Sequence, residues 1–560
     1  MEKIWMKNWP SGVPTEIHYL QGERPIFHYL RCHAKAWPGK TAINFYGLEI
    51  SYAEFDRLTD LFASYLLRGG LQKGDRVALY MQNCPQYSIC QIGAHKAGAI
   101  VVPCGPMFKA WELEEELTQT GTKTIVCQDE LYPCVKEANA KCEFDRIIVT
   151  GFKDFLPENP AFPIHETMQS PRIYFPETVE LLEILGKDCS GDTFPEVTVD
   201  DVCLLQFTSG TTGLPKGAML THGNQLYKSA AQAMAYKFEP SDIMVTAMPI
   251  YHIAGMLFAI TTPLYTGCTV NIITRFDALT LAAAINNLKA TKMYSTVSMN
   301  VDVMNLPDIS SYDLSSMRIT MATSFGIFLT KEVAENWSRA TQGGVIVEAA
   351  YGLSETHTGD TFSPLDKPRI GSTGIPHAGT DITIVDFDDQ SVELPAGQVG
   401  EITVKSPGVF KGYWDREDAT KEVLRDDRLY TGDMGKFDED GYFYFLGRKK
   451  EMIKSSGYAI APEEVEAFMM RHPAVKQAAC IPIPDPKRGE AVKAFVILNQ
   501  DHVGKVSEQE LINWAKGKMA AYKYPREIEF CQEIPKSTTG KILRRILREE
   551  ETSKRKGTAV

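Results

Sequence analysis

One stretch of ten residues, TSGTTGLPKG from Thr208 to Gly217, combines the groups that bind polyphosphate. Glycine lets backbone amides approach an anion closely, hydroxyls can donate to phosphate oxygens, and Lys216 adds a positive charge. Segments rich in glycine and threonine are more often flexible surface loops. The position of this segment between two apolar runs favours phosphate binding instead. The candidate contacts are Thr208, Ser209, Gly210, Thr211, Thr212, Gly213 and Lys216.

Two apolar segments should hold this loop. Val202 to Phe207 is typical of a buried strand leading in, and Ala218 to Leu220 of a strand leading out. A helical pattern begins only near Thr221, which is a suitable N-cap. A Walker loop would place Ser or Thr directly after the lysine and begin a helix there, so we expect a different phosphate loop, between strands.

This loop resembles the phosphate loop of the adenylate-forming enzymes, which include acyl-CoA synthetases, adenylation domains of peptide synthetases and beetle luciferases. Further motifs in the family order extend the resemblance over nearly the whole chain. It implies a large N-terminal domain over residues 1–447 and a small mobile domain over residues 448–560. The motifs are YGLSE from Tyr351, TGD ending at Asp433, GRKKE from Gly447 and PKSTTGK ending at Lys541.

Alternating strand and helix patterns predict an α/β fold with parallel sheets flanked by helices. Val77 to Tyr80, Pro85 to Ala97 and Ala99 to Val102 have the pattern of one β-α-β unit. We expect several such subdomains, a small β-rich section beginning at Gly400, and a compact α+β domain at the C-terminal end. The segment from Phe152 to Asp200, rich in proline and acidic residues, is predicted to be mostly a connection.

Composition excludes several classes of protein. The net charge of -12 argues against a general nucleic-acid binder, because such a chain has no overall positive field for phosphate backbones. The twelve cysteines are scattered without a CxxC pair, which predicts reduced thiols and a cytoplasmic protein. No apolar run approaches the roughly 18 residues of a membrane helix, so we expect no integral membrane segment, although peripheral membrane contact stays compatible with the sequence.

The nucleotide contacts beyond the loop are implied by the resemblance. The ring of Tyr351 would lie against adenine, and Glu355 would hold Mg²⁺, which prefers oxygen ligands. Asp433, expected at a tight turn, would accept from both ribose hydroxyls, and Arg448 would contact the ribose and phosphate side. The remaining candidates on this side are Gly326, Gly352 and Ser354.

The acyl pocket is predicted from a strand-to-helix junction and two strand ends. His252 and Gly255 follow an apolar strand, although a lone histidine is more often structural. The strand ends are Thr296 to Asn300 and Met321 to Ile327. Here the sequence departs from the family pattern, because Ser298 stands where proline is usual and Phe325 where glycine is usual. The size of the acid is therefore left open.

The C-terminal motifs complete the predicted site. By resemblance Lys450 is the hinge of the mobile domain. Gly457 would let its strand approach the pantetheine arm of coenzyme A, and Lys454 and Tyr458 are the other residues expected on the coenzyme A side. Lys541 would bridge the carboxylate and the α-phosphate. The predicted catalytic groups are Lys541, Glu355 and Thr211.

The charged tail from Arg544 to Val560 is predicted to be a frayed, solvated helix, because it mixes blocks of both signs.

We therefore predict an AMP-forming acid–thiol ligase that uses ATP, Mg²⁺ and coenzyme A as co-substrate, most similar to fatty-acyl-CoA synthetases of medium or long chain specificity. An aryl-acid ligase, an enzyme loading a carrier protein and a luciferase-like oxygenase share these motifs. A non-catalytic nucleotide sensor would be expected to lack reacting groups that are present here. The expected partners are small molecules, and a homodimer is compatible with the resemblance.

Overall fold

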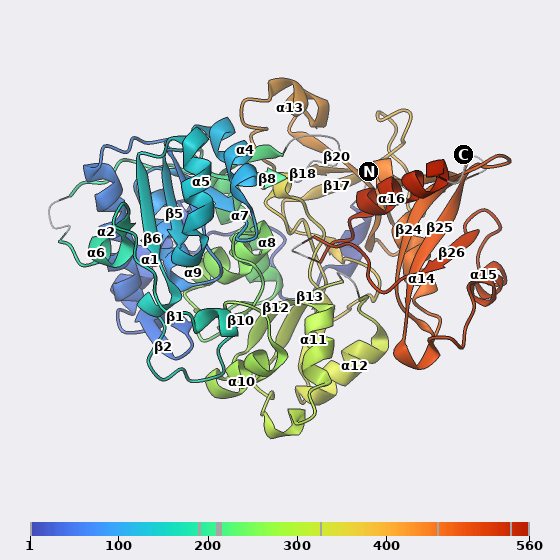
Figure 1. Cartoon of the computed structure of the whole chain (residues 1–560), viewed down its shortest axis with the longest axis horizontal. Coiled ribbons are helices and arrows are strands. Elements are labelled where there is room, and N and C mark those ends of the chain that lie inside the picture. Colours follow the sequence, from blue (N-terminus) through green and yellow to red (C-terminus); the bar gives the residue numbers. More distant parts are fainter. Residues whose placement is uncertain are drawn as a thin grey trace.

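The computed structural model describes residues 3–188, 192–208, 215–324, 327–455, 458–537 and 540–557. Two seven-stranded sheets, a five-stranded antiparallel sheet and a five-stranded C-terminal sheet form its frame. In Figure 1 the C-terminal strands, in orange and red, stand at one side, and the antiparallel sheet lies between them and the blue lobe. The predicted α/β class is confirmed.

The first seven-stranded sheet carries the predicted β-α-β units. Its strands pair in parallel, except that the last two are antiparallel. In spatial order they are β7 (Val179–Glu180), β6 (Arg146–Thr150), β5 (Thr124–Gln128), β3 (Arg76–Tyr80), β4 (Ile100–Cys104), β8 (Val202–Thr208) and β9 (Lys216–Thr221). The helices around it are α2 (Tyr52–Arg68), α3 (Pro85–Lys96), α4 (Ala110–Thr120), α5 (Tyr132–Cys142) and α6 (Leu181–Leu185).

The second seven-stranded sheet is parallel except for the hairpin around Gly47. Its strands are β14 (Val345–Glu348), β13 (Ile319–Thr323), β12 (Lys292–Thr296), β10 (Ile243–Thr246), β11 (Thr269–Ile272), β1 (Thr41–Phe45) and β2 (Leu48–Ser51). The helices of this part are α1 (Ile26–Ala36), α7 (His222–Ala235), α8 (Ile253–Met256), α9 (Thr262–Thr266), α10 (Ala278–Leu288), α11 (Val297–Met304) and α12 (Lys331–Ala340).

One apolar core joins these two sheets, because α2, α3 and α7 contribute buried side chains to the same cluster as strands of both sheets. Burial of one large apolar side chain contributes about 1.5–3 kcal/mol, so this shared core should keep the two sheets in a fixed relation.

The β-rich section and the C-terminal domain follow. The antiparallel sheet contains β17 (Asp381–Val385), β18 (Gly400–Lys405), β20 (Arg428–Phe437), β19 (Leu424–Arg425) and β21 (Phe443–Arg448), with α13 (Glu417–Val423) beside it. The C-terminal sheet contains β22 (Ile453–Ser455), β23 (Tyr458–Ile460), β24 (Val475–Asp485), β25 (Gly489–Leu498) and β26 (Glu527–Phe530). Its helices are α14 (Pro462–Met469), α15 (Glu508–Lys516) and α16 (Arg544–Gly557). Helix α14 begins at Pro462, a residue that suits the first turn of a helix.

Three local expectations were wrong. Asp433 lies within strand β20, not at a tight turn, because the pairing of this strand with β18 and β21 continues past it. Gly432, with φ +67°, lies where the pairing with β18 shifts register. The chain turns into helix directly after Thr296, whose side chain caps α11. The charged tail is not a solvated helix, since Leu547 on α16 is buried in an apolar cluster with β24 and β25.

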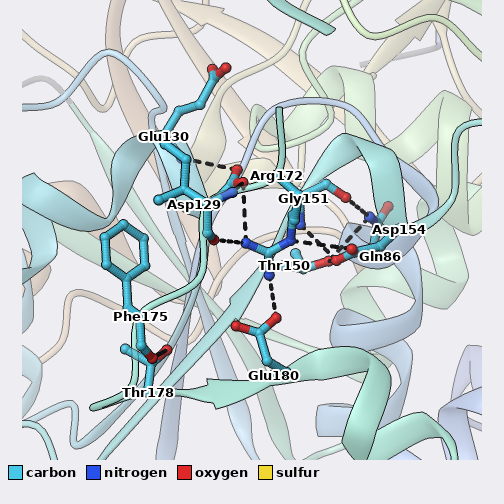
Figure 2. A network of polar contacts seen from close by, with 11 residues as sticks. Gln86, Asp129, Glu130, Thr150, Gly151, Asp154, Arg172, Phe175, Thr178 and Glu180 are labelled. Atoms are coloured by element: carbon cyan, nitrogen blue, oxygen red, sulfur yellow. Dashed lines mark hydrogen bonds and ion pairs between the residues drawn. The ribbon is translucent and has the colours of Figure 1, made fainter. Parts of the chain in front are cut away.

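The predicted connection between β6 and β8 contains a buried ionic cluster centred on Arg172, shown in Figure 2. The guanidinium contacts Asp129 Oδ2 at 3.1 Å, Asp154 Oδ1 at 3.2 Å and the carboxylate of Glu180. Only 6% of the Arg172 side chain is exposed. This segment is therefore fastened to the ends of β5 and β6 and to β7, the edge strand of the sheet.

Candidate active site

The strands that flank the predicted phosphate loop are present. Thr208 and Lys216 are paired across β8 and β9, and the Thr208 hydroxyl lies 3.4 Å from the Lys216 carbonyl oxygen. Helix α7 begins only after Thr221, whose side chain accepts from the Asn224 amide. The predicted contacts within the loop lie outside the described residues: Ser209, Gly210, Thr211, Thr212 and Gly213.

Tyr413 connects the two sides of this phosphate region. Its hydroxyl donates to Glu355 Oε1 at 2.7 Å, and the ammonium of Lys216 lies 5.0 Å from the centroid of its ring. Backbone hydrogen bonds from Met219 to Gly412 and from Trp414 to Gly217 hold the segment of Tyr413 against β9. Sequence reasoning missed this residue, because only tertiary pairing brings it to the loop.

Glu355 lies in a turn that is stabilised by a buried ion pair. The turn, Ser354–Thr356, places the Thr356 hydroxyl 2.5 Å from Asp360 Oδ2, to which it donates. Lys228 Nζ lies 2.6 Å from the other oxygen of Asp360, and neither charged side chain has any exposed surface. The backbone of Glu355 is also fixed, since its carbonyl accepts from the Phe410 amide at 2.8 Å.

The carboxylate of Glu355 suits Mg²⁺. Among the described residues its side-chain hydrogen bond comes from the neutral Tyr413 hydroxyl. Mg²⁺ is commonly held by one or two carboxylates together with substrate phosphates and water.

Tyr351, Asp433 and Arg448 form a second polar group. The Tyr351 hydroxyl donates to Asp433 Oδ2 at 2.8 Å, and Arg448 Nε lies 2.8 Å from Asp433 Oδ1. The Tyr351 ring is buried against Phe443 and Phe445. Burial raises the pKa of Asp433, while Arg448 opposes the rise. An acid held in this way has a fixed orientation, as recognition of a diol requires.

Lys541 lies on the turn just before helix α16 of the C-terminal domain. Its backbone closes a turn with Ser537, which accepts from the Lys541 amide and donates its own amide to the Lys541 carbonyl. Although Lys541 keeps an exposed surface, desolvation lowers the pKa of its ammonium, and Arg448 lowers it further, while Asp433 opposes the shift.

His252 joins the same region. It precedes α8, and burial followed by the charge of Lys541 lowers the pKa of His252 to about 4. The imidazole is therefore neutral near pH 7. Close packing requires glycine at position 255, because a Cβ there would lie 1.9 Å from the Pro249 carbonyl oxygen. Ser298 lies in the first turn of α11, where its hydroxyl is 2.8 Å from that of Thr296.

The loop after β13 is only partly described, since Phe325 and Gly326 lie outside the described residues. Ser324, which precedes them, donates to both oxygens of Glu348 through its amide, at 3.0 Å, and its hydroxyl, at 2.5 Å. Burial raises the pKa of Glu348 to about 7. Sequence reasoning also missed Glu348, although it ends a strand directly before the YGLSE motif.

The other predicted residues occupy expected elements. Lys450 lies in a short turn between β21 and β22, and Lys454 is exposed on β22, where its amide donates to Glu490 Oε2 at 2.7 Å. Gly457 lies outside the described residues, and Tyr458 begins β23. Gly352 allows a close approach, since a Cβ would lie 2.4 Å from the Gly359 amide nitrogen.

Comparisons with known proteins agree with this arrangement. The family model described as AMP-binding enzyme matches residues 30–414, and the model of the AMP-binding enzyme C-terminal domain matches residues 464–541. A long-chain-fatty-acid–CoA ligase from Bacillus subtilis (strain 168) is 36% identical, with 98% of each chain covered. A feruloyl-CoA synthase from Amycolatopsis sp is 31% identical, with 91% of this chain and 96% of that protein covered.

Among solved structures, the crystal structure of ATP-bound MatB from Rhodopseudomonas palustris is similar, with a TM-score of 0.81 and 27% identity. It covers 93% of this chain and 98% of that chain.

Proposed function

This chain belongs to the AMP-binding enzyme family, and from that premise we propose that it is an AMP-forming ligase that joins a long-chain fatty acid to coenzyme A. The observation that carries the proposal is the geometry of the nucleotide side: Tyr413 directs the Glu355 carboxylate, and Tyr351 and Arg448 hold Asp433. The similarity to a long-chain-fatty-acid–CoA ligase supports the class of acid. Lys541, on the turn before α16, is the cation that adenylate formation would require.

In the proposed first step, a carboxylate oxygen attacks the α-phosphorus of ATP, and the bond to pyrophosphate breaks. Two anions must approach each other, so catalysis depends on positioning and charge neutralisation. Lys541 would hold the carboxylate against the α-phosphate, and Lys216 would bind the phosphates that leave. Asp433 would orient the ribose, beside Arg448.

Bound Mg²⁺ would neutralise phosphate charge. Glu355 is the residue that would hold it, and Tyr413 would fix the direction of that carboxylate through the hydrogen bond to Oε1. His252 would lie beside the reacting carboxylate. Because its imidazole is neutral near pH 7, it would not form an ion pair that competes with Lys541 for this carboxylate.

In the proposed second step the thiol sulfur of coenzyme A attacks the acyl carbon, AMP leaves, and the thiol proton passes to solvent. A thiol with a pKa near roughly 8.5 is already partly ionised at neutral pH, so a dedicated base is unnecessary. The predicted contacts for this step are Lys454, Gly457 and Tyr458. We propose that rotation about Lys450 presents this strand and Lys541 in turn, with the domain boundary at residues 447 and 448.

The test is pyrophosphate release across a panel of saturated acids of increasing chain length, with and without coenzyme A. We expect release that depends on the acid, a maximum with long-chain acids, and a thioester only when coenzyme A is present. Release without acid, or failure to form a thioester with any acid, would contradict the proposal.

A second candidate acid class is aromatic. The similarity to the feruloyl-CoA synthase favours including ferulate and benzoate in the same panel. A higher kcat/KM for these acids than for every fatty acid would assign the pocket to aryl acids and leave the ligase reaction intact.

Further properties stay proposals. No helix in the described ranges is both long and apolar enough to cross a membrane. All eleven described cysteines are free thiols, which supports a cytoplasmic location. The homodimer and the peripheral membrane contact are still predictions of the sequence alone.

A further inference from the structure

Arg544 lies three residues after Lys541 and is almost completely buried, with 4% of its surface exposed. It is the first residue of α16 and therefore the point at which the lysine-bearing turn joins the body of the C-terminal domain. The turn itself closes just before it, through pairing of Lys536 with Ile542 and a hydrogen bond from the Leu543 amide to Pro535.

Three carboxylates surround the guanidinium of Arg544. Glu466 makes a two-pronged contact, with Nε to Oε1 at 3.0 Å and Nη2 to Oε2 at 2.7 Å. Nη1 lies 2.7 Å from Glu451 Oε2 and 2.8 Å from Glu463 Oε1. Since Glu451 directly follows the predicted hinge Lys450, one arginine connects the hinge turn, helix α14 and the base of the Lys541 turn.

The cluster also extends to the larger domain. A Cβ on Gly447 would lie 1.9 Å from Glu463 Oε2, so this carboxylate reaches the backbone of β21 only because residue 447 is glycine. Burial raises the pKa of Glu463 to about 7, and Arg544 opposes the rise. Arg448, the next residue of β21, is the partner of Asp433.

Charge balance has a direct consequence for Lys541. One guanidinium contacts three carboxylates, and Lys541 lies three residues before it on the turn that joins α16. If the guanidinium were removed, these carboxylates would lose their main partner at short range, and an unpaired buried charge costs several kcal/mol. Two nearby cations on the same segment could replace it: Arg548, which already donates to the Glu451 carbonyl, and Lys541.

We propose that Arg544 is a positioning residue for adenylate formation: it occupies Glu451, Glu463 and Glu466, and thereby keeps the Lys541 ammonium available to the reacting phosphate. The inference rests on the proposed function, which assigns the chemistry to Lys541. Arg544 itself contacts neither acid nor nucleotide, and it acts through the base of the turn and through the charge that it neutralises.

The experiment compares two half-reactions in Arg544→Met, in the full-length protein. Adenylate formation should fall by about 10- to 100-fold, as expected when a reacting group is displaced by about 1 Å. Thioester formation from supplied acyl adenylate and coenzyme A should be largely unchanged. Arg172→Met is the matched control, since it also removes a buried arginine from three carboxylates and should leave the ratio of the two rates unchanged.

Two further variants separate charge capture from general damage. Arg544→Met with Glu463→Gln should recover part of the adenylation rate, because one competing carboxylate is removed. Arg544→Lys should retain more adenylation than Arg544→Met, and it carries the same half-reaction test if the methionine variant does not fold. Equal loss of both half-reactions in each foldable variant would overturn the proposal.

The pH profile of adenylation gives a readout that a purely structural role would not change. The groups that interact with the charge of Lys541 are Arg448 on β21, Asp433 on β20, Lys450 and Glu451 in the turn after β21, Glu463 on α14 and His252 before α8. Capture by carboxylates raises the pKa of an ammonium, so the alkaline limb should move to higher pH in Arg544→Met. An unchanged limb, together with unchanged half-reaction ratios, would contradict the proposal.

Lys541→Ala serves as the reference. If its adenylation rate is normal, the proposed function is wrong. If its adenylation is lost while Arg544→Met keeps the normal ratio, only the role of Arg544 is wrong.

Discussion

Arg172 and Arg544 are two buried arginines with nearly the same surroundings, and each contacts three carboxylates. Arg172 joins segments of one sheet, as Figure 2 shows, and the residues proposed to react are not among its partners. Arg544 contacts Glu451 in the turn of the proposed hinge and lies three residues from Lys541. We propose that the same ionic chemistry stabilises one sheet in the first case and positions the reacting lysine in the second.

The two clusters differ in what their elements do during the proposed reaction. The partners of Arg172 belong to the first sheet and its connecting segment, which share one core and should move together. The partners of Arg544 lie on the turn directly after β21, at the expected domain boundary, and on α14, which follows β22 and β23. Position relative to the hinge, more than the number of ion pairs, should decide whether a mutation affects stability or rate.

The largest expected effect on stability is in Arg172→Met. Three carboxylates would lose their shared cation, and breaking a buried ionic group typically costs about 3–5 kcal/mol. Denaturant unfolding should show this loss, with fluorescence and circular dichroism followed separately because the chain has more than one domain. The protein that remains folded should keep the normal ratio of half-reactions, and a selective loss of adenylation would remove the distinction between the two arginines.

A smaller and more local pair of variants sharpens the same distinction. Tyr413→Phe removes the hydroxyl bound to Glu355, and Tyr444→Phe removes one that donates to Asp438 at 3.1 Å on the outer part of β21. A hydrogen bond to a charged group contributes about 1.5–3 kcal/mol, so Tyr413→Phe should raise the Mg²⁺ concentration needed for half-maximal adenylation by roughly tenfold.

The ring of Tyr413 and its contact with Lys216 remain in Tyr413→Phe, so KM for ATP at saturating Mg²⁺ should change little. Tyr444→Phe should leave the Mg²⁺ requirement normal. If both variants have the same requirement, the hydroxyl of Tyr413 does not orient the proposed metal ligand.

Much of the fold follows from local patterns. Apolar runs and their alternation with helices predicted β3, β4, β8 and β9 of the first large sheet, together with helix α3 between β3 and β4. Asp433 was misplaced because glycine before an acid is typical of a turn, whereas here Gly432 lies inside a long strand. Local statistics cannot show that the strand continues, since its pairing with β18 and β21 is tertiary.

The site was predicted unevenly for a similar reason. Motif residues such as Glu355 and Lys541 could be identified because they lie within short, recognisable sequences. Arg544 is 93 residues from Glu451 and lies in a run of mixed charge that indicated only a solvated tail. Its partners become known only when the C-terminal domain is folded.

The most direct test of the proposed two-step mechanism measures both half-reactions in Lys541→Ala. We expect acid-dependent pyrophosphate release to fall by at least about 100-fold, because a preorganised charge at the reacting phosphate is lost. Thioester formation from supplied acyl adenylate should stay close to the normal rate. Equal loss of both half-reactions, or a normal rate of pyrophosphate release, would contradict it.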